Sequence, residues 1–61
     1  SEVDVEGLRF TLMSARGGTI VQIRQYDRHK DVNNYTTYII TDREDLAAEV
    51  GRIVSMEMLK L

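Results

Sequence analysis

The stretch from Asp27 to Asp31 contains the residue types that acid–base catalysis or metal binding would need. His29, the single histidine of the chain, has an aspartate two residues away on each side. In an extended chain these three side chains point the same way, so the carboxylates could orient the imidazole as a base or share a metal ion with it. The intervening Arg28 and Lys30 disfavour a cation. Since a loop histidine is commonly just solvated, we expect no catalytic residue and no metal ligand here.

Serine and glycine occur without the motifs that would give them a catalytic or phosphate-binding role. Ser14 and Ser55 lack the Gly-x-Ser-x-Gly elbow of a nucleophile. Arg16-Gly17-Gly18 lacks the glycine spacing of a pyrophosphate-binding loop and fits a hairpin turn. A chain of 61 residues also leaves little room for a substrate pocket. We predict that the protein is not an enzyme and takes no cofactor and no small-molecule substrate.

Length and composition favour one small domain, residues 1–61, that associates with a partner. The chain has no cysteine, no proline and no tryptophan. A chain of this size buries only about 60% of the surface that its unfolded form exposes. Small domains commonly gain stability from disulfides, metals or oligomerisation, and the lack of cysteine excludes the first. No apolar run approaches the roughly 18 residues of a membrane span, so we expect a protein partner rather than a membrane. The lack of cysteine and of a signal-peptide pattern leads us to expect a cytoplasmic protein.

Two segments alternate in the pattern of a β-hairpin. Leu8 to Ala15 alternates apolar and polar side chains, and Thr19 to Tyr26 is rich in β-branched residues. Between them, Gly17-Gly18 supplies the positive φ angles of a two-residue turn. That turn pairs residues whose numbers sum to 35, so Leu12 faces Ile23. The pairing places five apolar side chains on one face: Leu8, Phe10, Leu12, Val21 and Ile23.

A third strand and a helix follow. Tyr35 to Ile40 has strand composition, and either Tyr38 and Ile40 or Tyr35 and Ile39 could face inward. Thr41 and Glu44 fit a capping box at the start of a helix. The apolar residues behind it recur at helical spacing: Leu46, Val50, Ile53, Val54, Met58 and Leu61.

Gly51 leaves two interpretations of the C-terminal residues. It could allow a close approach of one helix to the sheet, or it could end the helix, so that residues 54–58 alternate as a further strand. One helix is favoured, because methionine, glutamate, leucine and lysine are good helix formers. The predicted fold is therefore α+β in the order β-β-β-α: a three-stranded antiparallel sheet over residues 8–41 and one C-terminal helix over residues 42–60, packed on one face. Residues 1–6 form an acidic segment that we expect to be flexible.

Apolar residues outside the expected core indicate a surface for association. Met13 and Ile20 fall on the second face of the hairpin, and Met58, Leu59 and Leu61 crowd the C-terminus. Methionine adapts readily to interfaces, and an open edge strand invites pairing with a second copy. We predict a small regulatory interaction protein, of the size of many accessory proteins including phage-encoded ones, that binds itself as a homodimer, a larger protein, or both.

The alternative is a nucleic-acid-binding domain that uses the same face of the sheet. Residues 7–30 carry five basic side chains and one aspartate, although the whole chain has a net charge of −2. The contacts would be Arg9, Arg24, Tyr26, Arg28 and Lys30, because guanidinium and ammonium groups contact phosphates and a tyrosine can stack on a base. Acidic segments at both ends and a pI of 5.2 oppose this function.

Overall fold

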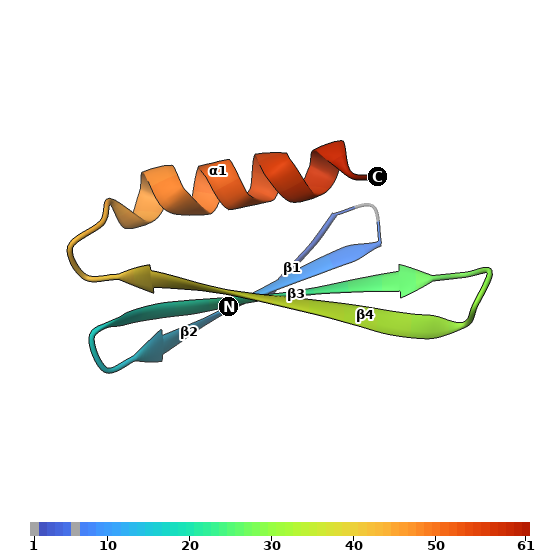
Figure 1. The fold of residues 1–61 in the computed structure, drawn as a ribbon, viewed down its shortest axis with the longest axis horizontal. Helices are drawn as coiled ribbons and strands as arrows, with labels where there is room; N and C mark the ends of the chain where they lie inside the picture. Colours follow the sequence, from blue (N-terminus) through green and yellow to red (C-terminus); the bar gives the residue numbers. More distant parts are fainter. Residues whose placement is uncertain (1, 6) are drawn as a thin grey trace.

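The computed structural model describes residues 2–5 and 7–61, which form an antiparallel sheet and a C-terminal helix (Figure 1). The elements are β1 (Glu2–Val5), β2 (Leu8–Ala15), β3 (Gly18–Asp27), β4 (Val32–Thr41) and α1 (Leu46–Leu59). The strands lie in the sheet in the order β1-β2-β3-β4, so every connection between neighbours is a hairpin. The α+β class and the single helix are as predicted, including helical structure at Arg52 to Leu59.

The sheet has four strands, so the prediction of three was wrong. The additional strand, β1, lies within the acidic segment and pairs antiparallel with β2, with Val3 opposite Phe10 and Asp4 opposite Arg9. Gly7 has a φ of +84° immediately before β2, a conformation that favours glycine. Four residues rich in acids give a weak strand pattern, and pairing with β2 rather than intrinsic propensity makes this segment a strand.

The β2–β3 hairpin has the predicted faces but a different register. Paired residue numbers sum to 33, with Leu12 opposite Val21 and Ala15 opposite Gly18. The loop is therefore Arg16-Gly17, of which Gly17 alone has a positive φ, at +85°. Because the register differs by two residues, each side chain keeps the face that the sequence predicted.

Gly18 belongs to β3, because β4 passes directly beside it. It pairs with Thr41, and a Cβ atom at Gly18 would overlap the carbonyl oxygen of Ile40. This close approach, rather than a turn conformation, requires glycine at position 18. Along β4 the inward residues are Tyr38 and Ile40, which resolves the alternative left open by the sequence.

The helix begins at Leu46, four residues later than predicted. Its N-cap is Asp45, whose carboxylate accepts a hydrogen bond from the Ala48 N–H at 3.2 Å. Glu44 does reach back to the Thr41 N–H, at 3.0 Å, but this contact closes the turn ahead of the helix. A Cβ atom at Gly51 would meet nothing within 4 Å, so the suggestion that Gly51 allows close approach to the sheet was wrong.

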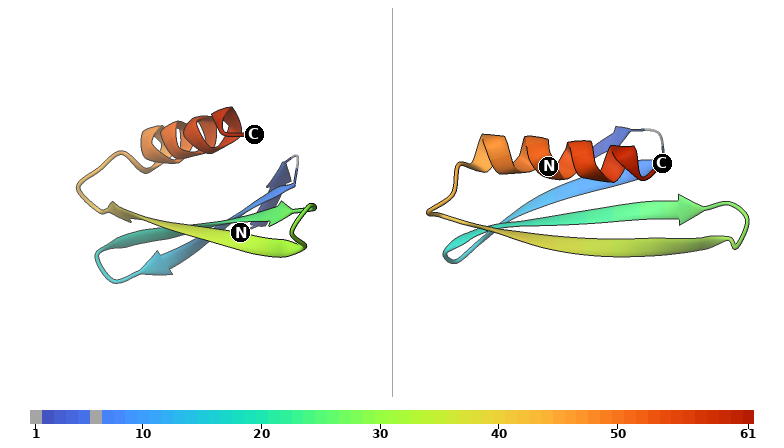
Figure 2. Two further views of the ribbon diagram at one scale, coloured as in Figure 1. Left: turned by 45° about the vertical axis from the view of Figure 1, so that its right-hand side comes forward. Right: turned by 45° about the horizontal axis from the view of Figure 1, so that its top comes forward.

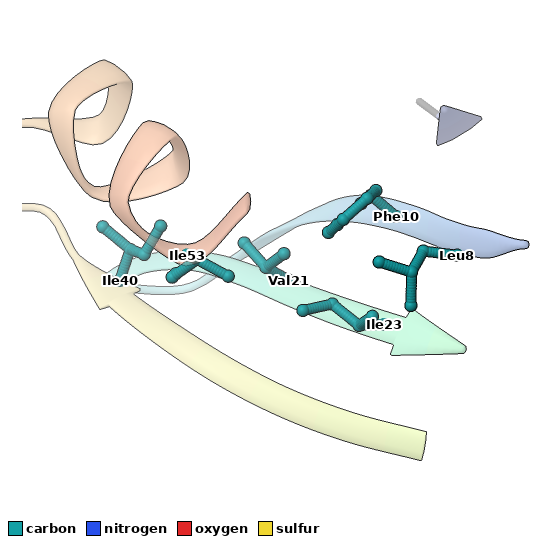
Figure 3. Packing of buried hydrophobic residues seen from close by; sticks show 6 residues of the cluster. All are labelled: Leu8, Phe10, Val21, Ile23, Ile40 and Ile53. Carbon is teal, nitrogen blue, oxygen red and sulfur yellow. The ribbon is translucent and has the colours of Figure 1, made fainter. Parts of the chain in front are cut away.

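The core lies between one face of the sheet and α1. Figure 3 shows its buried members, which come from β2, β3, β4 and α1: Leu8, Phe10, Val21, Ile23, Ile40 and Ile53. Leu12, Tyr38, Val50 and Val54 pack around them. Both views in Figure 2 place the helix on this face, and the β3–β4 hairpin extends beyond the end of the helix. The opposite face of the sheet, hereafter the outer face, has no helix over it among the described residues.

Candidate functional site

An apolar row crosses the outer face next to the β2–β3 turn. Met13 lies directly opposite Ile20, and Ile20 lies directly opposite Ile39. Met13 is 41% exposed and Ile39 is 73% exposed, while Ile20 is half-buried between them. We call Met13, Ile20 and Ile39 the apolar row. The sequence singled out the first two, and Ile39 joins them because Ile40 takes the inward position on β4.

Polar side chains border the apolar row, with Glu2 of β1 at one end opposite Thr11. Thr11, Gln22 and Thr37 lie opposite one another in the next row of the outer face. Each can donate and accept hydrogen bonds. The apolar row therefore has a hydrogen-bonding border on the side away from the turn.

The third row contains the two arginines of the outer face. Arg9 lies opposite Arg24, and Arg24 lies opposite Tyr35. Two like charges in directly opposite positions destabilise a sheet, and Asp4 offsets this because its Oδ1 lies 3.1 Å from the Arg9 Nε. Glu2 adds a longer contact of 3.8 Å. The hydrogen bond to Asp4 raises the pKa of Arg9 above its already high ordinary value.

Arg9 is thus engaged within the sheet, whereas Arg24 makes no side-chain hydrogen bond or ion pair within residues 2–5 and 7–61. The described part of this face carries two acids, Glu2 and Asp4, beside its two arginines. The basic excess that the sequence placed on this face is therefore balanced by β1, the strand that the sequence did not predict.

The remaining predicted nucleic-acid contacts lie at or near the β3–β4 turn. The Tyr26 hydroxyl donates a 2.5 Å hydrogen bond to Asp31 Oδ1, which raises the pKa of Tyr26. Arg28 and Lys30 are exposed in the turn itself. Arg24, which lies opposite Arg9, is three residues before the end of β3 at Asp27, so Arg9 and Arg24 lie toward this end of the β3–β4 hairpin.

The acid–histidine–acid stretch forms this same turn. Asp27 Oδ1 accepts the backbone N–H groups of His29, at 2.9 Å, and Lys30, at 3.3 Å. Asp31 has a φ of +52° and binds the Tyr26 hydroxyl. Both carboxylates therefore hold the turn in shape, and the described residues contain no group of acids, histidines or cysteines that could hold a metal ion.

The C-terminal apolar residues lie in the other layer of the molecule, Met58 and Leu59 in the last turn of α1 and Leu61 just after it. Met58 is 38% exposed, Leu59 87% and Leu61 51%. The structure does not bring them together with Met13 and Ile20, because α1 packs on the opposite side of the sheet. The predicted association residues thus form two separate surfaces.

Glu57 is the one charged residue among the described buried side chains, and the sequence did not single it out. Its Oε2 accepts hydrogen bonds from the Tyr38 hydroxyl at 2.6 Å and from Lys60 Nζ at 2.9 Å. The Tyr38 bond, followed by the Lys60 bond, lowers the pKa of Glu57 below its ordinary value. Its position four residues after Ile53, on the inward stripe, was the available signal. Because its bonds join the helix to the sheet, we interpret Glu57 as structural.

No pocket is present in the part of the chain that the structure describes. The helix found there is too short and too polar to cross a membrane. Comparisons with protein-family models, curated proteins and solved structures give no match to this chain. The outer face and the exposed edges of the sheet are therefore interpreted from their own chemistry.

Proposed function

We propose that the protein is a small non-enzymatic interaction module of the cytoplasm, homodimeric, which binds a larger protein through the outer face of its sheet. The observation that carries this proposal is the apolar row. Three side chains from three strands lie directly opposite one another on a face that no described helix covers, and the largest exposure, that of Ile39, is 73%.

The surroundings of the apolar row support a protein partner. Protein interfaces combine an apolar centre with a polar rim, and they are rich in methionine, tyrosine and arginine. Here Thr11, Gln22 and Thr37 border the row, and Arg24 with Tyr35 follow one row further. Single exposed apolar residues are normal on any surface, whereas a contiguous apolar patch marks a binding site.

Nucleic acid as the partner of the same face has weaker support. Arg24 beside Tyr35 offers one guanidinium and one aromatic ring, the groups that contact phosphate and stack on bases. The other arginine of this face, Arg9, is held by Asp4 and Glu2, whose negative charges repel phosphate. If this alternative were correct, the wild-type protein would retain labelled DNA at low salt, and Arg24→Glu would abolish that retention.

Photo-crosslinking with competition tests the protein partner. A photoactivatable residue replaces Gln22, beside the apolar row, and the protein is irradiated in its own cell extract with unlabelled competitor added. We expect one discrete crosslinked adduct, and wild-type protein added as competitor should suppress its formation. The Met13→Asp variant should be needed at a concentration at least about ten times higher than wild type to give the same suppression, because a charge within an interface weakens binding. Ser14→Asp is the matched control, with the same new charge on the neighbouring exposed residue but on the other face. Equal competition by Met13→Asp and wild type would contradict the proposal.

A further inference from the structure

The two edges of the sheet differ in length and charge. One edge is β1, which has four residues and carries Glu2 and Asp4. The other edge is β4, which has ten residues, Val32–Thr41, without a charge, a proline or a glycine. Edge strands are usually protected from pairing by charges, prolines, bulges or short length. β1 has two of these protections, whereas β4 has none of them.

The free edge of β4 presents unused backbone groups. Along a strand of an antiparallel sheet, the N–H and C=O groups of successive residues point alternately toward the strand on one side and the strand on the other side. The Asp42 N–H donates toward the β2–β3 turn, to the Gly17 carbonyl at 3.0 Å. The Thr41 N–H donates away from β3, to Glu44. By this alternation the odd-numbered residues Asn33, Tyr35, Thr37 and Ile39 direct their N–H and C=O groups to the free edge.

No described strand pairs with this edge, since β4 is terminal in the sheet. The right-hand view of Figure 2 shows β4 at the margin of the sheet, with α1 over one face and away from that margin. A further strand could therefore be added beside β4 without displacing the helix.

Charge at the two ends of β4 identifies what would pair there. The strand follows a turn with exposed Arg28 and Lys30 beside one acid, Asp31, and it precedes a turn with three exposed acids beside one base: Asp42, Glu44 and Asp45 with Arg43. Antiparallel pairing of two copies brings the cationic turn of each copy beside the acidic turn of the other, twice by symmetry. Parallel pairing would instead place like charges together, which is unfavourable.

We propose that the dimer forms by antiparallel pairing of β4 with β4 of a second copy, around a two-fold axis at Thr36, to give one continuous sheet. This inference rests on the proposed function, because it names the interface of the proposed homodimer. In this register Tyr35 lies opposite Thr37 of the second copy and Asn33 lies opposite Ile39. Every free backbone group of the odd-numbered residues 33–39 is then paired, and the pairing stops at Thr41, whose N–H Glu44 already occupies.

The same register covers an exposed apolar residue on the helix side of the sheet. Val32, the first residue of β4, is 44% exposed. In the dimer Val32 lies opposite Ile40 of the second copy, whose side chain is in the core. Symmetric pairing of this kind also keeps both helices on one side and joins the two outer faces into one surface for the larger partner.

Disulfide trapping tests the pairing directly, because the chain contains no other cysteine. In Thr36→Cys the two sulfurs meet across the two-fold axis, where opposite Cα atoms lie about 4.5 Å apart, within disulfide range. In the matched control Thr37→Cys, a neighbouring exposed threonine, the two cysteines are offset by two residues and out of range. We expect a covalent dimer from Thr36→Cys under mild oxidation, formed at least about tenfold faster than from Thr37→Cys, since Cα atoms beyond 7 Å cannot be bridged. Equal trapping of the two variants, or faster trapping of Thr37→Cys, would overturn this pairing.

A charge swap tests the contribution of the turns without touching the strand. Lys30→Glu and Asp42→Lys change exposed residues that lie opposite each other in the proposed dimer. Each should raise the dimer dissociation constant, measured by sedimentation, by about tenfold, because each places like charges together twice. The double variant should recover wild-type dimerisation. No recovery, or a wild-type monomer at about 1 mM, would overturn the inference. If the wild-type protein were monomeric but still gave the crosslinked adduct that Met13→Asp competes for poorly, binding to a larger protein would remain the proposed function and only the homodimer would be ruled out.

Discussion

The hydroxyl of Tyr38 in β4 lies 2.6 Å from Oε2 of Glu57 in α1 and donates a hydrogen bond to it. This bond joins the helix to the sheet beside a core made of aliphatic side chains and Phe10. Glu57 is 6% exposed, and carboxylates are rarely buried unless they are paired. Lys60, one turn further along, supplies the second bond to the same oxygen. The pair thus fixes the position of α1 on the sheet with a directional contact that the apolar side chains lack.

Removing the Tyr38 hydroxyl should destabilise the fold. We expect Tyr38→Phe to lower the free energy of unfolding by about 1–3 kcal/mol, because it leaves a buried carboxylate with Lys60 as its remaining described partner. Urea denaturation monitored by circular dichroism measures this change. In the Tyr38→Phe background, Glu57→Leu should restore much of the lost stability, since replacing both polar partners by apolar groups leaves neither unpaired. Wild-type stability of Tyr38→Phe alone would show that the hydrogen bond contributes nothing.

The same pair predicts how stability depends on pH. The pKa of Glu57 is lowered from its ordinary value of 4.5 by the Tyr38 hydrogen bond first and by Lys60 second. Its contribution is therefore present above pH 4.5 and is lost as the pH falls through the lowered pKa. The pKa of Tyr38 is raised from 10.0, chiefly by the hydrogen bond to Glu57. That contribution is present below pH 10 and is lost as the pH rises through the raised pKa.

The measurement is the difference in unfolding free energy between wild type and Tyr38→Phe as a function of pH. Other titrating groups, such as Glu44, whose pKa is lowered by Thr41, are present in both proteins and cancel. We expect a plateau at neutral pH and a smaller difference at both the acidic and the alkaline end. A difference independent of pH would mean that the variant acts through packing rather than through the hydrogen bond.

The sequence predicted the fold well where local patterns determine it. The strands within residues 8–41, the C-terminal helix and the faces of the β2–β3 hairpin are as expected. The predicted register of this hairpin was wrong by two residues. Because side chains alternate between the two faces with a period of two residues, this error leaves every side chain on its predicted face. Met13 and Ile20 were placed on the outer face for the same reason.

Features that depend on tertiary contacts were not predictable in this way. β1 is only four residues long. Its Asp4 lies opposite Arg9, which in turn lies opposite Arg24, and this arrangement of charges is known only once the sheet is formed. Glu57 occupies an inward helical position because Tyr38 from β4 meets it there. The apolar row also needed β4, since Ile39 could join it only after Ile40 had been assigned to the core.

Two glycines with opposite environments give the most direct test of the register. Gly18 is the first residue of β3, and Gly51 lies in the middle of α1, where glycine is intrinsically unfavourable relative to alanine. A Cβ atom at Gly18 would overlap the backbone of β4, and backbone cannot move aside as a flexible side chain would. We expect Gly18→Ala to lower the free energy of unfolding by about 1–3 kcal/mol, the usual cost of overpacking.

Gly51→Ala is the matched control, because its Cβ atom would meet nothing within 4 Å on the exposed side of α1. It should raise the free energy of unfolding by about 0.5–1 kcal/mol, through the higher helix propensity of alanine. Thermal and urea unfolding of the two variants beside wild type measure both changes. If Gly18 were instead the second residue of the turn, as the sequence suggested, β4 would not pass beside it. Gly18→Ala would then lack this clash, and its cost would be only that of placing alanine at a positive φ. Equal effects of the two substitutions would therefore contradict the observed pairing of Gly18 with Thr41.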